Sequence, residues 1–276
     1  MISSIIDYSY ATAEKAAISV LSRGRIPQHV GFILDGNRRY ARKAGASNTK
    51  FGHYEGFKQL KKVSIQSITV FAFSIENFKR SEEEVAYLMQ LFREAFTIFA
   101  EKNELIDQYQ IGIRICGHLS YLPPDVQELA NKVMERTQHN KTRYFNICCP
   151  YTSRDEMTTA IKENVQLVEQ NKINADDITE KSIQDHLFTS ASPPLDILVR
   201  TSGEIRLSDF LLWQASDKCQ IQLLNCFWPE LTFWKFLPIL LEYQIYHDDT
   251  SSRNNNHNDS LVDNNSSSNH TNGINE

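Results

Sequence analysis

HVGFILDGNRRYARK, residues 29–43, joins an apolar run to a glycine turn and then to a basic segment able to start a helix. The apolar run predicts a strand buried on both faces. The turn offers backbone N–H groups and a positive helix end to an anion. Asp35 supplies a hard oxygen that suits magnesium, while Arg38 and Arg39 supply guanidinium forks that suit phosphates. Taken alone, Asp-Gly-Asn is more often a plain turn than a site.

Apolar runs of the same kind recur along the chain and alternate with helical patterns. The runs are His29–Leu34, Ser67–Phe73, Gln110–Cys116, Arg143–Cys149, Leu195–Val199 and Gln220–Leu224. The helical patterns cover residues 81–101, 123–139 and 153–170, opened by Ser81 with Glu84, by Pro123-Pro124, and by Ser153 with Glu156. This alternation predicts an α/β fold with a central, mostly parallel sheet covered by helices. Ligands of such sheets bind beyond the carboxyl ends of the strands.

Composition divides the chain into three parts. Residues 1–24 carry an apolar stripe of helical period, which predicts either a packed surface helix or an amphipathic helix touching a membrane surface. Residues 25–246 hold all six apolar runs and predict one domain. Residues 247–276 are rich in Asn and Ser and almost without apolar side chains, so we expect a disordered tail.

Charge and cysteine content narrow the class of protein. A formal net charge of −5 argues against nucleic-acid binding, which needs a broad basic surface. The five cysteines include no CxxC pair and favour buried thiols in a reducing compartment over disulfides or zinc. No apolar run approaches the roughly 20 residues that span a bilayer, so we expect a soluble or peripheral protein.

The segment RTSGEIRLSDFLLWQ, residues 200–214, follows a predicted strand and offers a second anion site. Arg200 and Arg206, with the Ser208 hydroxyl, could clamp a diphosphate. The alternative is a surface loop in which Arg206 pairs with Glu204.

The segment FAFSIENFKR, residues 71–80, also follows a predicted strand. Ser74, Asn77, Phe78 and Arg80 combine polar groups with an aromatic ring, which suits binding of a reacting allylic group. The same residues could form a capped loop without a site.

Six blocks in this order resemble the cis-prenyltransferases, the family of undecaprenyl and dehydrodolichyl diphosphate synthases. They are HVGFILDGNRRYARK, FGHYEGF, FAFSIENFKRSEEEV, IRICGHLSYLP, YTSRDE and RTSGEIRLSDFLLWQ, within a match from about Pro27 to Tyr246. The resemblance implies addition of isopentenyl diphosphate to an allylic diphosphate such as farnesyl diphosphate, giving a long polyprenyl diphosphate with cis double bonds. It also implies a hydrophobic tunnel, Mg²⁺ as cofactor, and a dolichol product made for protein glycosylation at the cytosolic face of the endoplasmic reticulum.

The resemblance assigns roles to individual residues. Asp35 corresponds to the aspartate that binds magnesium and diphosphate. His53 corresponds to a histidine near the diphosphates, a role that the resemblance favours over a helix-start histidine with a local hydrogen bond. Ser74 and Asn77 would orient the allylic carbon, and Phe78 would pack on its isoprene. The allylic diphosphate would be bound by Gly36, Asn37, Arg38, Arg39 and Arg80, and isopentenyl diphosphate by Arg200, Arg206 and Ser208. The stripe that would help line the tunnel is Val85, Leu88, Met89, Phe92 and Phe96.

The chain departs from the family pattern at three places. It is about seven residues shorter between His53 and Ser74, around Val63-Ser64-Ile65. Cys219 stands where bacterial members have an acidic residue associated with magnesium. Residues 230–276 carry no Arg-x-Gly triplet, so we expect a partner subunit of the Nogo-B-receptor type to supply it.

Two alternatives stay open. The shortened segment favours a catalytically impaired or scaffold subunit, although the DGN loop and its arginines are retained. A trans-prenyl synthase would need two aspartate-rich motifs, and the chain has one candidate, Asp176-Asp177-Ile178-Thr179-Glu180, which also reads as a polar helix start. Product length depends on tunnel depth and does not follow from the sequence.

Overall fold

The computed structural model describes residues 2–35, 64–101 and 104–246 of the 276-residue chain. Its contacts form two compact units. The first combines Met1–Ile26 with Trp234–Glu276, and the second is Pro27–Phe233. Residues 234–246, which the composition placed with the large domain, therefore group with the N-terminal helix.

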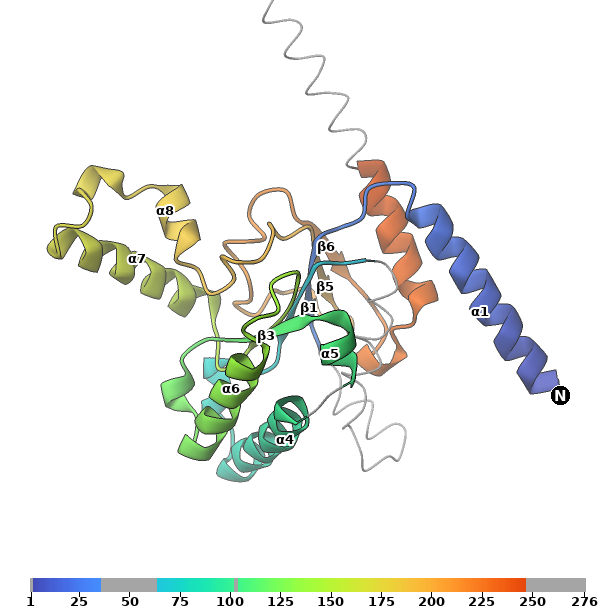
Figure 1. Cartoon of the computed structure of the whole chain (residues 1–276), viewed down its shortest axis with the longest axis horizontal. Helices are drawn as coiled ribbons and strands as arrows, with labels where there is room; N and C mark the ends of the chain where they lie inside the picture. Colours follow the sequence, from blue (N-terminus) through green and yellow to red (C-terminus); the bar gives the residue numbers. More distant parts are fainter. Residues whose placement is uncertain (1, 36–63, 102–103, 247–276) are drawn as a thin grey trace, which may run out of the picture. The chain divides into compact units, whose positions relative to one another are not determined.

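The second unit is built on a parallel sheet in which six strands are described (Figure 1). Along the chain the strands are β1 (His29–Ile33), β2 (Ser67–Phe71), β3 (Ile111–Cys116), β4 (Arg143–Cys148), β5 (Ile197–Arg200) and β6 (Gln220–Leu223). In space their order is β3-β4-β2-β1-β5-β6, and every pair is parallel. The predicted parallel sheet is confirmed, and each predicted apolar run forms one of its strands.

The central strands are buried because helices and loops cover both faces of a parallel sheet. Every residue of β1 and β5 is buried, whereas β6 alternates between half-buried and exposed residues, as suits an edge strand. The chain adds β2 on one side of β1 and β5 on the other, so the topology reverses at β1. A crevice for ligands is expected at such a reversal.

Helices α4 (Glu82–Ala100), α5 (Glu104–Tyr109) and α6 (Pro124–Thr137) cover one part of the sheet. Ser81 caps α4 as predicted, because its side chain accepts a hydrogen bond from the Glu84 N–H. The Phe99 ring of α4 meets the Phe145 ring of β4 edge-on, with centroids 6.4 Å apart. This contact packs the C-terminal part of α4 against β4.

Helix α7 (Ser153–Glu169) does not begin with the predicted capping box. Its N-cap is Thr152, whose side chain makes no capping hydrogen bond, and Ser153 is the first helical residue. Glu156 is buried and accepts from the Tyr151 hydroxyl at 2.6 Å and the Phe188 N–H at 2.9 Å. The local pattern predicted that the Glu156 carboxylate would cap the start of α7, but the carboxylate instead accepts hydrogen bonds from Tyr151 and Phe188.

Among the described residues, five short elements complete the second unit. Thr179 caps α8 through a hydrogen bond from the Ser182 N–H, so the Asp-rich segment is a polar helix start. This outcome matches the non-catalytic interpretation of that segment. The short elements are η1 (Ile75–Lys79), η2 (Leu119–Tyr121), η3 (Ala175–Asp177) and η4 (Trp228–Glu230), together with α8 (Glu180–Asp185).

The first unit pairs α1 (Ile2–Leu21) with a helix over residues 233–246, and Figure 1 shows the two side by side. The Gln244 amide donates to the carbonyls of Leu21, at 2.8 Å, and Arg25, at 3.1 Å, which satisfies the end of α1. Tyr8, Tyr10 and Val20 of α1 are exposed. None of the helices within the described ranges is long and apolar enough to cross a membrane.

A buried polar group lies at the start of β1. The His29 ring contacts the Thr69 hydroxyl at 2.7 Å and the Pro193 carbonyl at 2.8 Å. Burial disfavours the charged ring and lowers the pKa of His29 to about 4. His29 is therefore neutral at neutral pH and acts as a hydrogen-bonded part of the core.

We expect His29 to make the protein less stable in mild acid. An unfolded histidine takes up a proton near pH 6.5, whereas folded His29 resists protonation until about pH 4, so stability falls as pH drops from 6.5 towards 4. Between pH 7 and pH 5 this amounts to about 2 kcal/mol. Urea unfolding at both pH values measures the loss.

The His29→Gln variant should lack this part of the pH dependence, because glutamine does not titrate. His139→Gln, at an exposed position, is the matched control and should keep the wild-type dependence. An unchanged slope in His29→Gln would contradict the assignment.

Candidate active site

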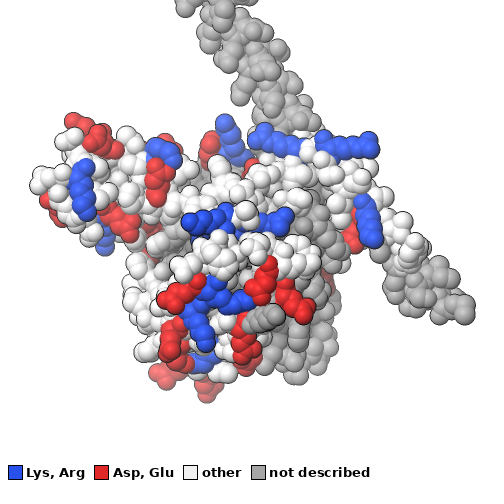
Figure 2. All heavy atoms as spheres, viewed as in Figure 1, with Lys and Arg blue, Asp and Glu red and all other residues white. Residues whose placement is uncertain are grey.

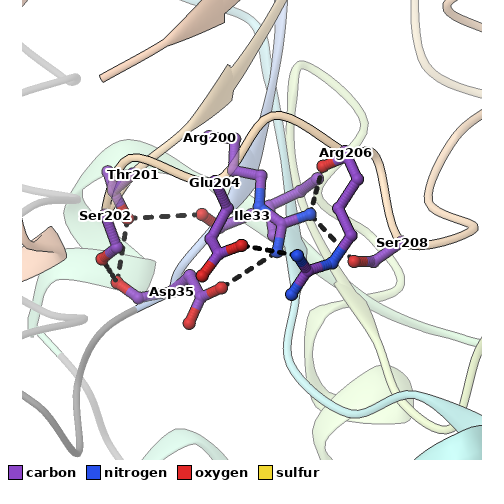
Figure 3. A network of polar contacts seen from close by, with 8 residues as sticks. All are labelled: Ile33, Asp35, Arg200, Thr201, Ser202, Glu204, Arg206 and Ser208. Carbon is purple, nitrogen blue, oxygen red and sulfur yellow. Dashed lines mark hydrogen bonds and ion pairs between the residues drawn. The ribbon is translucent and has the colours of Figure 1, made fainter. Parts of the chain in front are cut away.

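Two charged side chains meet where the sheet topology reverses. Ile33 and Arg200 are register partners on β1 and β5, so Asp35, two residues further on, lies next to Arg200. Arg200 donates from Nη2 to Asp35 Oδ2 at 2.9 Å (Figure 3). Residues 165 positions apart in sequence thereby form one ion pair at the carboxyl ends of adjacent strands.

Arg200 is the centre of this network. Its side chain is only 3% exposed. Nη1 donates to the Ser208 hydroxyl at 2.8 Å and also to the Arg206 carbonyl. A buried charge is costly unless it is paired and hydrogen-bonded, and these contacts supply both. The guanidinium therefore orders the loop that contains Arg206 and Ser208.

The backbone of Asp35 is also held by the loop after β5. Its carbonyl accepts from the Thr201 hydroxyl at 3.0 Å and from the Ser202 hydroxyl at 2.7 Å. Ser202 and Gly203 have φ values of 77° and 72°, so the chain turns sharply there. Both the side chain and the main chain of Asp35 are thus placed by residues 200–202.

Arg206 pairs with Glu204 at 2.5 Å, as the alternative interpretation of this loop expected. The Arg206 side chain is 66% exposed, so the pair is worth little to stability. Both side chains nevertheless line the same cavity as Arg200. Arg206 can therefore pair with Glu204 and still reach an anion in the cavity.

The segment after β2 is a capped 3-10 turn. The Ser74 N–H donates to the Asn77 side-chain oxygen at 3.0 Å, and the Ser74 hydroxyl accepts from the Glu76 N–H at 3.2 Å. Arg80 bonds Glu84 at 2.6 Å. Ser74, Asn77 and Arg80 line the cavity with Asp35 and Arg200, so the cap places them at the site.

The cavity has a volume of about 1180 Å³. Most of its polar lining lies beyond the strand ends, and its apolar lining comes mainly from α4 and from strands β1, β2 and β4. Leu88, Phe92 and Phe96 from the predicted stripe line it. Such a cavity has room for a molecule with a charged head and a hydrocarbon tail.

The other stripe residues and Phe78 lie elsewhere. Val85 and Met89 line a smaller neighbouring cavity of about 370 Å³. Phe78 also lines that smaller cavity, and its ring meets Phe73 edge-on at 4.9 Å. The structure thus separates these residues from the lining that holds Asp35.

Several predicted residues cannot be placed. Gly36, Asn37, Arg38, Arg39 and His53 lie outside the described residues. The shortened segment is described only from Ser64, which has a φ of 62°, and from Ile65, which is buried.

Arg154 and Asp209 also line the cavity, and residue patterns did not single them out. Arg154 Nε donates to Asp209 Oδ2 at 2.8 Å. Both occur within blocks that carry the family resemblance, YTSRDE and RTSGEIRLSDFLLWQ. Their pairing could not be seen in sequence because 55 residues separate them.

Asp35 fits a magnesium site that is completed by substrate. Its carboxylate is 34% exposed and lines the cavity. The described residues contain no cluster of three or more potential metal ligands, but Mg²⁺ commonly takes one or two carboxylates together with phosphate oxygens and water. Burial raises the pKa of Cys219 to about 12, so this neutral thiol is a poor ligand for a hard cation.

Acidic and basic side chains are interspersed on the face shown in Figure 2, in line with the mild net charge. The arginines that line the cavity are each paired with a carboxylate, as in the pair that joins Arg200 and Asp35. Local arginines can bind an anion in a protein of negative net charge because salt screens distant charges beyond roughly 8 Å.

Comparison with known proteins gives consistent results. A family model described as "Putative undecaprenyl diphosphate synthase" matches residues 33–250. A dehydrodolichyl diphosphate synthase complex subunit of Schizosaccharomyces pombe is 43% identical over 84% of this chain and 90% of its own length. The human subunit of that name is 41% identical over 85% of this chain and 72% of its own length.

A solved structure is similar as well. Lavandulyl diphosphate synthase from Lavandula x intermedia, in complex with dimethylallyl diphosphate, superposes with a TM-score of 0.67 at 29% identity. The match covers 79% of this chain and 95% of that chain.

We expect Arg200 to stabilise the site far more than Arg206 does. Arg200→Met should lower the free energy of unfolding by about 2 to 4 kcal/mol, because it leaves Asp35 and the Ser208 hydroxyl without their buried partner. Arg206→Met should cost less than about 1 kcal/mol, because its pair is exposed. Urea denaturation compares the two, and equal losses would show that Arg200 is not the organising side chain.

Proposed function

The chain belongs to the undecaprenyl diphosphate synthase family of prenyltransferases, and we propose that it adds isopentenyl diphosphate units to farnesyl diphosphate. The product is a long-chain polyprenyl diphosphate of the dehydrodolichyl type, used for dolichol synthesis and protein glycosylation. The observation that carries this proposal is the network of Asp35, Arg200 and Ser208 beside an apolar cavity of about 1180 Å³. It combines an anion site with room for a growing hydrocarbon.

The two substrates divide the polar lining between them. Arg200, Arg206 and Ser208 bind the diphosphate of isopentenyl diphosphate. The allylic diphosphate lies on the side of Asp35 and Arg80, with Gly36, Asn37, Arg38, Arg39 and His53 assigned by family resemblance. Each charge-assisted hydrogen bond to a phosphate contributes about 1.5 to 3 kcal/mol.

Bond formation follows from placing the two substrates together. The isopentenyl double bond forms a carbon–carbon bond to the first allylic carbon, the carbon–oxygen bond to the allylic diphosphate breaks, and one proton leaves the isopentenyl unit. Ser74 and Asn77 orient the allylic end. Fixing both reactants at one site removes much of the entropic cost of a bimolecular step.

Asp35 is the residue we assign to Mg²⁺ binding. Asp35 would hold the ion together with the allylic diphosphate, and the ion would supply charge neutralisation for the leaving diphosphate. Arg200 holds the Asp35 carboxylate from one oxygen, Oδ2, so the side chain is oriented before substrate arrives.

The elongating chain occupies the apolar part of the cavity. Burial of a five-carbon unit contributes roughly 3 to 4 kcal/mol at about 0.8 kcal/mol for each CH₂. Leu88, Phe92 and Phe96 of α4 form part of this lining. Apolar burial therefore favours retention of intermediates until the cavity is filled.

A partner subunit and a membrane location belong to this proposal. Residues 230–276 have no Arg-x-Gly triplet, and both dehydrodolichyl relatives are named as complex subunits, which supports a heteromer with a Nogo-B-receptor-like subunit. The exposed Tyr8, Tyr10 and Val20 support peripheral contact of α1 with the cytosolic face of the endoplasmic reticulum membrane.

Incorporation of labelled isopentenyl diphosphate tests the activity. The full chain, purified with any subunit that remains bound, should elongate farnesyl diphosphate in the presence of magnesium. Asp35→Ala should lower kcat by at least about a hundredfold, because leaving-group stabilisation by the metal is lost. Asp217→Ala, at an exposed aspartate between β5 and β6 that does not line the cavity, is the matched control and should keep wild-type activity.

Assays with and without the co-purified subunit distinguish the competing roles. Activity only in the complex, abolished by Asp35→Ala, supports a catalytic subunit. Activity that is insensitive to Asp35→Ala would identify this chain as a scaffold, and strong activity of the chain alone would remove the need for a partner.

We expect the cavity beside α4 to limit product length. Ala95 lines the large cavity, so Ala95→Trp should shorten the products by filling space that later isoprene units need. Ala86 lines the smaller cavity on the same helix, so Ala86→Trp should leave the product distribution unchanged. Thin-layer chromatography of the dephosphorylated products measures both, and equal distributions in wild type and Ala95→Trp would place the chain elsewhere.

A further inference from the structure

The turn that carries Ser208 is held in an unusual backbone conformation. Ser208, Asp209 and Leu211 have φ values of 52°, 62° and 47°, in the left-handed region that non-glycine residues seldom adopt. Such residues cost of order 1 kcal/mol each and persist where surrounding contacts over-determine them. The surroundings must therefore hold this turn in place.

Those contacts come from the start of α7. The Ser153 N–H donates to the Asp209 carbonyl at 2.7 Å, and the Arg154 N–H donates to Asp209 Oδ1 at 3.1 Å. The Leu212 N–H donates to the Ser153 hydroxyl at 2.9 Å. Since Thr152 gives α7 no side-chain cap, Asp209 satisfies its first N–H groups from 55 residues away.

The Arg154 side chain closes the same clamp. Its Nε donates to Asp209 Oδ2 at 2.8 Å, so one carboxylate receives both a backbone and a side-chain hydrogen bond from Arg154. The Asp209 side chain is 12% exposed, whereas that of Arg154 is 73% exposed. Asp209 is thus the fixed member of the pair, and it also lies at a helix N-terminus that favours a negative charge.

We propose that Asp209 is a positioning residue for binding of isopentenyl diphosphate, because it clamps the left-handed turn onto α7 and thereby fixes the Ser208 hydroxyl on Arg200. Ser208 immediately precedes Asp209, and its Oγ lies 2.8 Å from Arg200 Nη1. The inference rests on the proposed function, which assigns Ser208 and Arg200 to that substrate. Asp209 acts through Ser208 and does not itself bind the diphosphate.

The variants distinguish loss of the hydrogen bonds that clamp the turn from loss of the ion pair between Asp209 and Arg154. Asp209→Ala removes both acceptor oxygens, whereas Asp209→Asn keeps an oxygen for the Arg154 N–H and a residue type that tolerates positive φ. Arg154→Ala removes only the exposed side-chain bond and leaves its backbone donor. Asp107→Ala breaks the Asp107–Arg136 pair between α5 and α6 and is the matched control. Asp209→Gly adopts the turn without strain and serves if the alanine variant fails to fold.

Calorimetry of the full chain, with any bound subunit, measures binding of isopentenyl diphosphate and of farnesyl diphosphate separately, so that no turnover occurs. Asp209→Ala should weaken binding of isopentenyl diphosphate at least about tenfold, as expected for loss of a capping carboxylate. Its affinity for farnesyl diphosphate should be unchanged. Asp209→Asn and Arg154→Ala should stay within about threefold of wild type, and Asp107→Ala should match it. In a Ser208→Ala background, Asp209→Ala should lower the affinity for isopentenyl diphosphate by less than about a further twofold, because both substitutions act through one hydroxyl.

Other outcomes overturn the inference. Wild-type affinity in both Asp209→Ala and Asp209→Gly would show that the clamp is not needed. Equal losses of affinity in Asp209→Asn, Arg154→Ala and Asp209→Ala would mean that the ion pair with Arg154, and not the clamped turn, supports binding. Full additivity with Ser208→Ala would mean that Asp209 does not act through the Ser208 hydroxyl. If wild type binds neither diphosphate, the proposed function fails and this inference falls with it.

Discussion

The buried guanidinium of Arg200 is the contact on which the site depends. A charge at 3% exposure must find partners, and in this fold they are the Asp35 carboxylate, the Ser208 hydroxyl and the Arg206 carbonyl. These partners come from the ends of two adjacent strands and from the loop after the second of them. One desolvated cation thereby joins Asp35 after β1 to the loop after β5, the two halves of the proposed diphosphate site.

The cavity is balanced in charge before any substrate is present. Each arginine in the described lining has a carboxylate partner, which limits repulsion among the cations and holds their side chains. An incoming diphosphate can then compete with Glu84 for Arg80 and with Glu204 for Arg206, while the buried pair of Arg200 and Asp35 keeps its geometry. The pairs are Arg80–Glu84, Arg154–Asp209, Arg200–Asp35 and Arg206–Glu204.

Tertiary contacts also decide where local sequence rules fail. Ser153 and Glu156 have the spacing of a capping box, yet Glu156 is buried against Tyr151 and the first N–H groups of α7 are satisfied by Asp209. A capping bond contributes of order 1 kcal/mol, so a buried network with several hydrogen bonds outweighs it. The start of α7, where the local capping rule fails, is the place where the helix contacts the turn that contains Ser208.

The parallel sheet and the six strands of its described part could be predicted from the sequence, because burial on both faces leaves continuous apolar runs. The polar loops proposed to form the site could be predicted too, because they directly follow those runs. Family resemblance added the roles of Asp35, Arg200, Arg206 and Ser208. The folded chain alone shows that Asp35 pairs with Arg200, that Asp209 caps a distant helix, and that Phe78 lines a separate cavity. Those contacts join residues far apart in the chain, and hydrophobic periodicity reports only which face of each segment is buried, not which distant side chains will meet there.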